Sequence, residues 1–94
     1  MSWINLGEVS YVVERDLGRE KAVDTADFLR RRLALDLPTE ERVLAAAALK
    51  ARHPISYADC FAIATAIFYD AVLLTGDPDI LAADPSWPVE SLRP

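Results

Sequence analysis

Residues 55–79, ISYADCFAIATAIFYDAVLLTGDPD, decide the fold. Ser56 opens a segment that reaches about Tyr69, and nearly every position from Cys60 to Phe68 is apolar or small. This composition predicts a helix that is central and buried on most sides. The continuously apolar run Ala71–Thr75 follows and predicts a fully buried parallel strand. A buried helix that leads into a buried strand is typical of an α/β fold.

The residues that follow this strand predict a turn and two short elements. Gly76 allows a tight turn, and Pro78 suits the first position of a short helix expected at Asp79–Ala83. Trp87–Leu92 is the candidate for a last, short edge strand.

The residues that precede the 55–79 stretch predict three helices and a strand. Apolar side chains recur every three or four positions from Leu6, and Asn5 is placed to cap this helix. The expected elements are helices at Leu6–Leu17 and Arg19–Arg32, a strand at Leu33–Leu37, and a helix that Thr39 caps and His53-Pro54 ends. Together the elements predict one α/β domain over residues 1–94, built around a thin sheet.

Charge is unevenly distributed along the chain. The 94 residues carry a net charge of −5, which argues against simple electrostatic capture of nucleic acid. Residues 1–52 contain nine Lys or Arg and nine Asp or Glu, whereas residues 53–94 contain one and six. Acids without basic neighbours form either a solvated face or a site for a cation.

Other features exclude several classes of protein. Cys60 is the only cysteine and His53 the only histidine, so an internal disulfide and a Cys-rich zinc site are excluded. We expect Cys60 to be a small core residue and His53 to lie in a solvated loop. No apolar run is long enough for a membrane span, and the first residues lack the pattern of a secretion signal. We therefore expect a cytoplasmic protein without a membrane segment.

Three acids are candidates for a functional site, although each has a local explanation. The spacing Ser56-x-x-Asp59 approximates a capping box. Asp77 is placed to cap the next helix, and Glu8 complements the dipole near the start of its own helix. These acids nevertheless lie on three separate elements, and Asp77 follows the carboxyl end of a strand, where ligands bind in open α/β sheets. Mg²⁺ and Mn²⁺ prefer carboxylate oxygens and support phosphodiester cleavage, so the joint placement predicts a metal-dependent nuclease site.

Paired segments of the chain resemble the PIN-domain family, especially the VapC-type toxins of bacterial and archaeal toxin–antitoxin pairs. The resemblance rests on ISYADCFA at residues 55–62, the apolar helix after it, and VLLTGDPD at residues 72–79. INLGEVSYVV at residues 4–13 is similar to the helix that carries the family's glutamate. The resemblance covers essentially the whole chain and implies a compact α/β/α sandwich around a short parallel sheet.

The same resemblance implies a function and a set of site residues. It implies an endoribonuclease that depends on Mg²⁺ or Mn²⁺, with Glu8, Asp59 and Asp77 as the acids around the metal. Thr75 matches the family's hydroxyl residue near the site, and Asp79 is an outer contributor to the metal site. The implied partners are an RNA substrate, a second copy of the chain in a homodimer, and a small antitoxin whose tail enters the acidic groove.

The sequence departs from the family at its N-terminal side. The family begins with a central strand that ends in an aspartate, whereas Met1-Ser2-Trp3-Ile4, before Glu8, supplies neither the strand nor the acid. We therefore expect an N-terminally truncated PIN-like domain that lacks one metal ligand and is weak or inactive as a nuclease. A shortened form, a misassigned start and a natural remnant would all give this pattern.

Two other functions stay open at this point. The first is a catalytically inactive PIN-like remnant that serves as an antitoxin-binding or dimerisation module, which the absent acid favours. The second takes Asp77-Pro78-Asp79 as the Asp-x-Asp motif of a haloacid-dehalogenase-like phosphoryl-transfer enzyme. In that family the motif follows the first strand and a lysine comes later, whereas here the motif lies near the C-terminus and no lysine follows.

Overall fold

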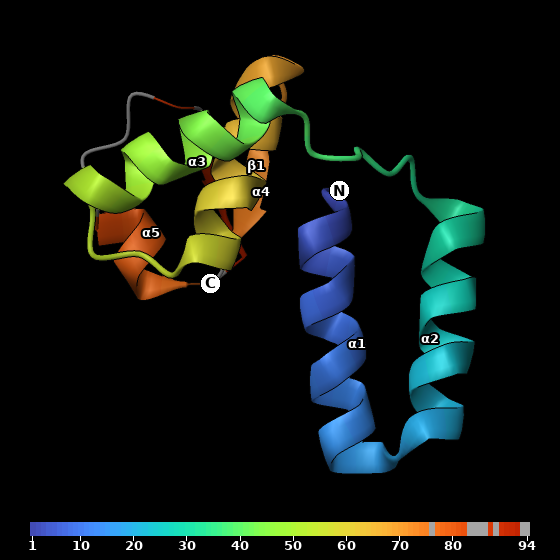
Figure 1. Cartoon of the computed structure of the whole chain (residues 1–94). Coiled ribbons are helices and arrows are strands. Elements are labelled where there is room, and N and C mark those ends of the chain that lie inside the picture. Colours follow the sequence, from blue (N-terminus) through green and yellow to red (C-terminus); the bar gives the residue numbers. More distant parts are fainter. Residues whose placement is uncertain (76, 83–86, 88, 93–94) are drawn as a thin grey trace. The chain divides into compact units, whose positions relative to one another are not determined.

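A computed structural model describes residues 1–75, 77–82, 87 and 89–92. The fold is mixed α/β, mostly helical with a short parallel sheet, as the sequence predicts (Figure 1). In chain order the elements are α1 (Trp3–Leu17), α2 (Arg19–Arg32), α3 (Glu40–Arg52), α4 (Tyr57–Phe68), β1 (Leu73–Thr75), α5 (Pro78–Ala82) and β2 (Val89–Ser91). None of the described helices combines the length and the apolar character that crossing a bilayer requires.

The chain forms two compact units, Met1–Pro38 and Thr39–Pro94. Each unit has its own helix pair, α1 with α2 in the first and α3 with α4 in the second. The expectation of one domain over residues 1–94 stays a prediction.

The N-terminal unit is a helical hairpin in which α1 and α2 lie side by side (Figure 1). Helix α1 begins at Trp3, and its cap is Ser2, whose Oγ accepts a hydrogen bond from the Ile4 amide at 3.2 Å. The predicted start at Leu6 with Asn5 as the cap is therefore wrong, because Asn5 already lies within the helix. Gly18 ends α1 and opens α2 with a φ of 93°, a conformation that favours glycine.

The predicted strand at Leu33–Leu37 is reduced to one parallel bridge between Ser2 and Asp36. The Trp3 amide donates to the Asp36 carbonyl at 3.0 Å, and the Asp36 amide donates to the Met1 carbonyl at 2.8 Å. The pairing stops there because the chain enters α1 directly after Ser2. The predicted strand therefore forms a bridge at one residue only, Asp36.

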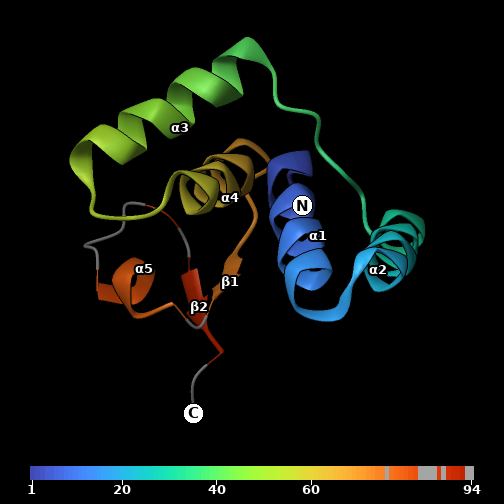
Figure 2. The same cartoon turned by 60° about the horizontal axis from the view of Figure 1, so that its bottom comes forward.

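The C-terminal unit contains α3 and α4 packed together, with boundaries close to those predicted (Figure 2). Thr39 caps α3 through a 3.3 Å bond from the Arg42 amide, and Ser56 caps α4 through a 3.2 Å bond from the Asp59 amide. Helix α3 ends with His53 as its C-cap, directly before Pro54. These ends follow from local hydrogen bonds and proline geometry, which explains why the sequence predicts them.

The sheet consists of β1 and β2, which run parallel and lie side by side (Figure 2). Leu73, Leu74 and Thr75 pair with Val89, Glu90 and Ser91 in that order. The predicted strand at Ala71–Thr75 is confirmed over its last three residues, but its predicted full burial is wrong, because the Leu74 residue is 58% exposed. Two described strands leave β1 less covered than a strand in the middle of a sheet.

The predicted short elements after β1 are shifted slightly. Helix α5 begins at Pro78, as that residue's geometry favours, and Ala83 lies outside the described residues. Of the predicted strand Trp87–Leu92, the structure forms Val89–Ser91, while Trp87 contributes its side chain to the core and Pro88 lies outside the described residues.

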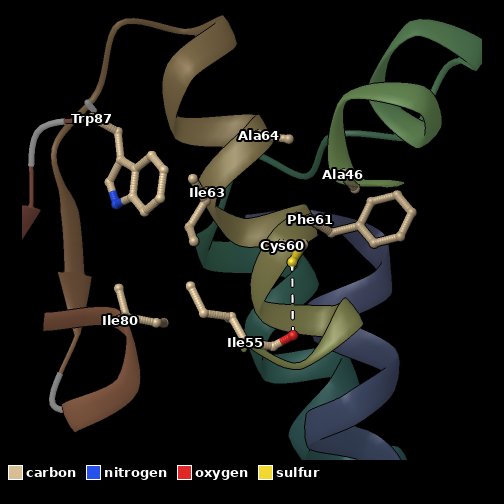
Figure 3. Close-up of a cluster of buried hydrophobic side chains, with 8 residues drawn as sticks. All are labelled: Ala46, Ile55, Cys60, Phe61, Ile63, Ala64, Ile80 and Trp87. Carbon is tan, nitrogen blue, oxygen red and sulfur yellow. Dashed lines mark hydrogen bonds between the residues drawn. The ribbon is translucent and has the colours of Figure 1, made fainter. Parts of the chain in front are cut away.

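The core of the C-terminal unit gathers around α4 (Figure 3). It comprises Ala46, Ile55, Cys60, Phe61, Ile63, Ala64, Ile80 and Trp87. The prediction that Cys60 is a core residue is confirmed. His53 is half-buried instead of solvated, because its ring packs edge-on against Trp87 with centroids 5.3 Å apart. At the C-terminal end of α4, the side chains of Ile67 and Phe68 are exposed to solvent.

Candidate metal centre

Asp59 lies in the first turn of α4 and is half-buried. Its amide donates to Ser56 Oγ at 3.2 Å, and the Ser56 side chain also forms a hydrogen bond with the Asp59 carboxyl group. The two interactions together fix the start of the helix and the position of the carboxyl group. The sequence predicts a capping role for Ser56, whereas the bond of its side chain to the Asp59 carboxyl group is found only in the folded chain.

Asp77 lies in the turn between β1 and α5. Its amide donates to Thr75 Oγ1 at 3.0 Å, while its Oδ1 accepts a bond from the Asp79 amide at 2.8 Å. The Asp77 carbonyl accepts from the Leu81 amide at 3.1 Å, so Asp77 caps α5. The capping explanation for Asp77 is therefore confirmed. One oxygen of its carboxyl group, Oδ1, serves the cap.

The carboxyl groups of Asp59 and Asp77 lie side by side. Burial raises the pKa of Asp59 above its ordinary value, and a hydrogen bond from the Ser56 side chain acts in the opposite direction. A hydrogen bond between Asp59 and Asp77, together with the negative charges of Asp77 and Asp79, raises this pKa further. The tertiary structure thus brings together two acids that are 18 positions apart in the sequence.

The other predicted site residues, Thr75, Asp79 and Glu8, lie in different parts of the structure. Thr75 is part of the site's architecture, since its hydroxyl oxygen holds the Asp77 amide. Asp79 is exposed at the first turn of α5. Glu8 is half-buried in α1 and belongs to the N-terminal unit. In the described part of the chain, no three His, Cys, Asp or Glu side chains are close enough to hold a metal ion. That Glu8 joins the two aspartates stays a prediction.

The donor set at this position suits a hard divalent cation. Asp59 and Asp77 offer carboxylate oxygens that repel each other when both are ionised. Over residues 1–75, 77–82, 87 and 89–92, no ion pair with Lys or Arg neutralises Asp59, Asp77 or Asp79. A cation such as Mg²⁺ or Mn²⁺ would relieve the repulsion, because it binds carboxylate oxygens and keeps several waters.

The fold is similar to that of two solved structures. One is VapBC2 from Rickettsia felis bound to a DNA fragment from their promoter, with a TM-score of 0.75 and 21% identity over 96% of this chain and 71% of that chain. The other is VapBC-1 from nontypeable Haemophilus influenzae, with a TM-score of 0.74 and 21% identity over 97% of this chain and 72% of that chain. No curated protein sequence matches this chain significantly.

The sequence itself matches a domain family over most of its length. The match extends from residue 1 to residue 84 and therefore includes Glu8, Asp59, Thr75, Asp77 and Asp79. It agrees with the fold comparison, with the parallel pairing of β1 and β2, and with the acids placed at the start of α4 and after β1. The chain belongs to the PIN domain family.

Proposed function

We propose that this protein is a VapC-type toxin, an endoribonuclease that hydrolyses RNA phosphodiesters with the help of Mg²⁺ or Mn²⁺. The observation that carries the proposal is the contact between the carboxyl groups of Asp59 and Asp77. Membership of the PIN domain family supports nuclease chemistry that depends on a divalent cation. The similarity to two VapBC structures supports a role in a toxin–antitoxin pair. We further propose that the protein is cytoplasmic and forms a homodimer that a small antitoxin neutralises.

Each residue of the proposed site has a defined task. Asp59 and Asp77 bind the cation, with Glu8 as a third carboxylate and Asp79 as an outer contributor. When bound, the cation supplies an activated water and stabilises the negative charge that develops on the phosphodiester. Ser56 holds the Asp59 carboxyl group in place, and Thr75 holds the backbone of Asp77.

Cleavage of single-stranded RNA in the presence of Mn²⁺ or Mg²⁺ tests the proposal. We expect weak cleavage that EDTA stops and that Asp59→Asn and Asp77→Asn each lower by about 100-fold or more, because each removes a ligand charge. Asp70→Asn is the matched control, since Asp70 is an exposed acid with a φ of 51°, a conformation that asparagine also adopts. Cleavage that survives EDTA, or that is lowered equally by all three variants, would contradict the proposal.

A second candidate is a non-enzymatic PIN-like module that binds an antitoxin or a second copy of the chain. The observation that favours it is a series of exposed apolar residues from the end of α4 to β1: Ile67, Phe68, Tyr69, Val72 and Leu74. Such side chains are typical of protein contact surfaces. Tight dimerisation or antitoxin binding, combined with no metal-dependent RNA cleavage by the wild-type chain, would favour this second function over the first.

A further inference from the structure

The carbonyl group of Ile55 connects the end of α3 to the start of α4. Lys50 Nζ, in the last turn of α3, donates a hydrogen bond to this oxygen at 2.9 Å. The Cys60 thiol approaches the same oxygen at 4.0 Å (Figure 3). The Ile55 side chain lies in the core. One residue of the loop between the two helices is therefore held both by its side chain and by its carbonyl group.

This connection reaches the acidic site through one further residue. Ser56 follows Ile55, and its hydroxyl oxygen and carbonyl oxygen accept the amides of Asp59 and Cys60 at 3.2 and 3.0 Å. If the Ile55 carbonyl were released, Ser56, the next residue in the chain, could shift together with its two acceptor oxygens, and the first turn of α4 would loosen. A bond from a charged ammonium is stronger than one from a thiol, so Lys50 is the stronger of the two donors to the Ile55 carbonyl.

The position of the Lys50 ammonium follows from this hydrogen bond. Its acceptor, the Ile55 carbonyl, directly precedes Ser56, the N-cap of α4. Lys50 is therefore not merely a solvated residue at the end of α3.

We propose that Lys50 is a positioning residue of the acidic site, which holds the Ile55 carbonyl and thereby fixes the Ser56 cap and the Asp59 carboxyl group. The inference rests on the proposed metal-binding function of Asp59 and Asp77. Lys50 itself touches neither the cation nor the RNA in this proposal. Its effect on Asp59 passes through the backbone of two residues.

The sign of the effect separates positioning from simple electrostatics. Removing a positive charge near a cation site strengthens cation binding by Coulomb's law. Loss of positioning weakens cation binding, because Asp59 then spends less time in the binding geometry. Lys50→Met removes the charge and the donor together while keeping an unbranched stem. Arg52→Met removes an equal charge from the same turn of α3, and Arg52 is exposed.

The test compares Mn²⁺ affinity, by calorimetric titration, and amide hydrogen exchange at Asp59 and Cys60 in the wild type and both variants. We expect Lys50→Met to weaken Mn²⁺ binding about fivefold and to speed exchange at both amides by a similar factor, as the loss of one hydrogen bond of ~1 kcal/mol implies. Arg52→Met should leave exchange unchanged and Mn²⁺ affinity equal or slightly higher. Lys50→Arg keeps a charged donor and should restore most of both effects.

Each outcome decides a separate point. Tighter Mn²⁺ binding by Lys50→Met, or unchanged exchange at Asp59 and Cys60, overturns the positioning role. Equal losses of affinity in Lys50→Met and Arg52→Met also overturn it, since they would reflect helix α3 as a whole. If the wild-type chain does not bind Mn²⁺, the proposed function fails, and the exchange measurement still decides whether Lys50 orders the first turn.

Discussion

At the scale of single residues, Asp59 shows a conflict between stability and function. An acid in the first turn of a helix normally stabilises it, because its charge complements the helix dipole. Here burial and the neighbouring acids raise the pKa of Asp59, so the folded state disfavours its ionised form. Functional sites commonly retain such costs, because the charge that destabilises the fold is the charge that a ligand needs.

This conflict predicts how stability depends on pH. Because the pKa of Asp59 is raised in the folded state, its stabilising contribution is present below the unfolded value of about 3.9 and is lost as the pH rises through the folded value. Without added metal, Asp59→Asn should therefore raise the free energy of unfolding at pH 7 and flatten its decline above pH 4. Urea unfolding across this range measures the effect. A decrease in stability at pH 7 would contradict it, and Asp70→Asn should change stability by less than about 0.5 kcal/mol.

Arg42 gives a second prediction at the residue scale. Its guanidinium carbon lies 3.3 Å from the centroid of the Phe68 ring, and Arg42 is only 5% exposed. Phe68 is 56% exposed, so a partly desolvated cation–π contact of this kind is worth about 0.5–1.5 kcal/mol. A double-mutant cycle of Arg42→Met and Phe68→Leu, followed by urea unfolding, should give a coupling energy in that range. The cycle of Arg52→Met with Phe68→Leu is the control, and similar coupling in both cycles would refute the contact's contribution.

At the scale of elements, the helix starts are determined by capping side chains. Ser2, Thr39 and Ser56 each accept a bond from a backbone amide two or three residues ahead. Helix α2 begins instead at Gly18, which offers no side-chain cap. Of the three caps at Ser2, Thr39 and Ser56, the Ser56 cap alone also holds a side chain of the proposed metal centre.

The caps therefore predict a separation of stability from metal binding. Ser56→Ala and Thr39→Ala should each lower the free energy of unfolding by about 1 kcal/mol, because each leaves a helix amide without its side-chain partner. Only Ser56→Ala should also weaken Mn²⁺ binding, since its hydroxyl group bonds the Asp59 carboxyl. Thermal unfolding and metal titration of the two variants measure the difference. Equal Mn²⁺ affinities would show that the Ser56 hydroxyl does not position the carboxyl group.

At the scale of the whole molecule, one group of exposed apolar residues lies where α4 leads into β1. The exposed residues there include Ile67, Phe68, Val72 and Leu74, and most are more than half exposed. Parallel sheets are normally covered on both faces, so a two-stranded parallel pair with an exposed leucine favours association. This surface suits the homodimer that we propose for the protein.

Association is the property to measure for this surface. Ile67→Lys should shift the chain from dimer toward monomer in light scattering after gel filtration, because it places a charge within the apolar series. Its effect on stability should stay within about 0.5 kcal/mol, since Ile67 is half exposed. Leu44→Lys, at an exposed position of α3, is the matched control and should leave association unchanged. An unaltered dimer in the Ile67 variant would place the interface elsewhere.

The predicted elements succeeded where the determining interactions are local. The limits of α2, α3 and α4 depend on residues such as Gly18, Thr39 and Ser56, which act within a few positions of themselves. The start of α1 was missed because the apolar periodicity begins at Leu6, whereas the cap at Ser2 starts the helix earlier. The strand at Leu33–Leu37 was overextended because its partner, the segment before α1, pairs at Ser2 alone.

For the site, the sequence by itself determined which residue types are present and what family they indicate. The motifs at residues 55–62 and 72–79 pointed to the PIN domain family, and the matching of residues 1–84 confirms it. Only the tertiary structure decided that the carboxyl groups of Asp59 and Asp77 meet and that the Lys50 ammonium donates to the Ile55 carbonyl. The physical reason is that β1 packs against α4, so the first turn of the helix and the end of the strand come together. A carboxylate's neighbours, and hence its charge state, are set by that packing and not by its position in the chain.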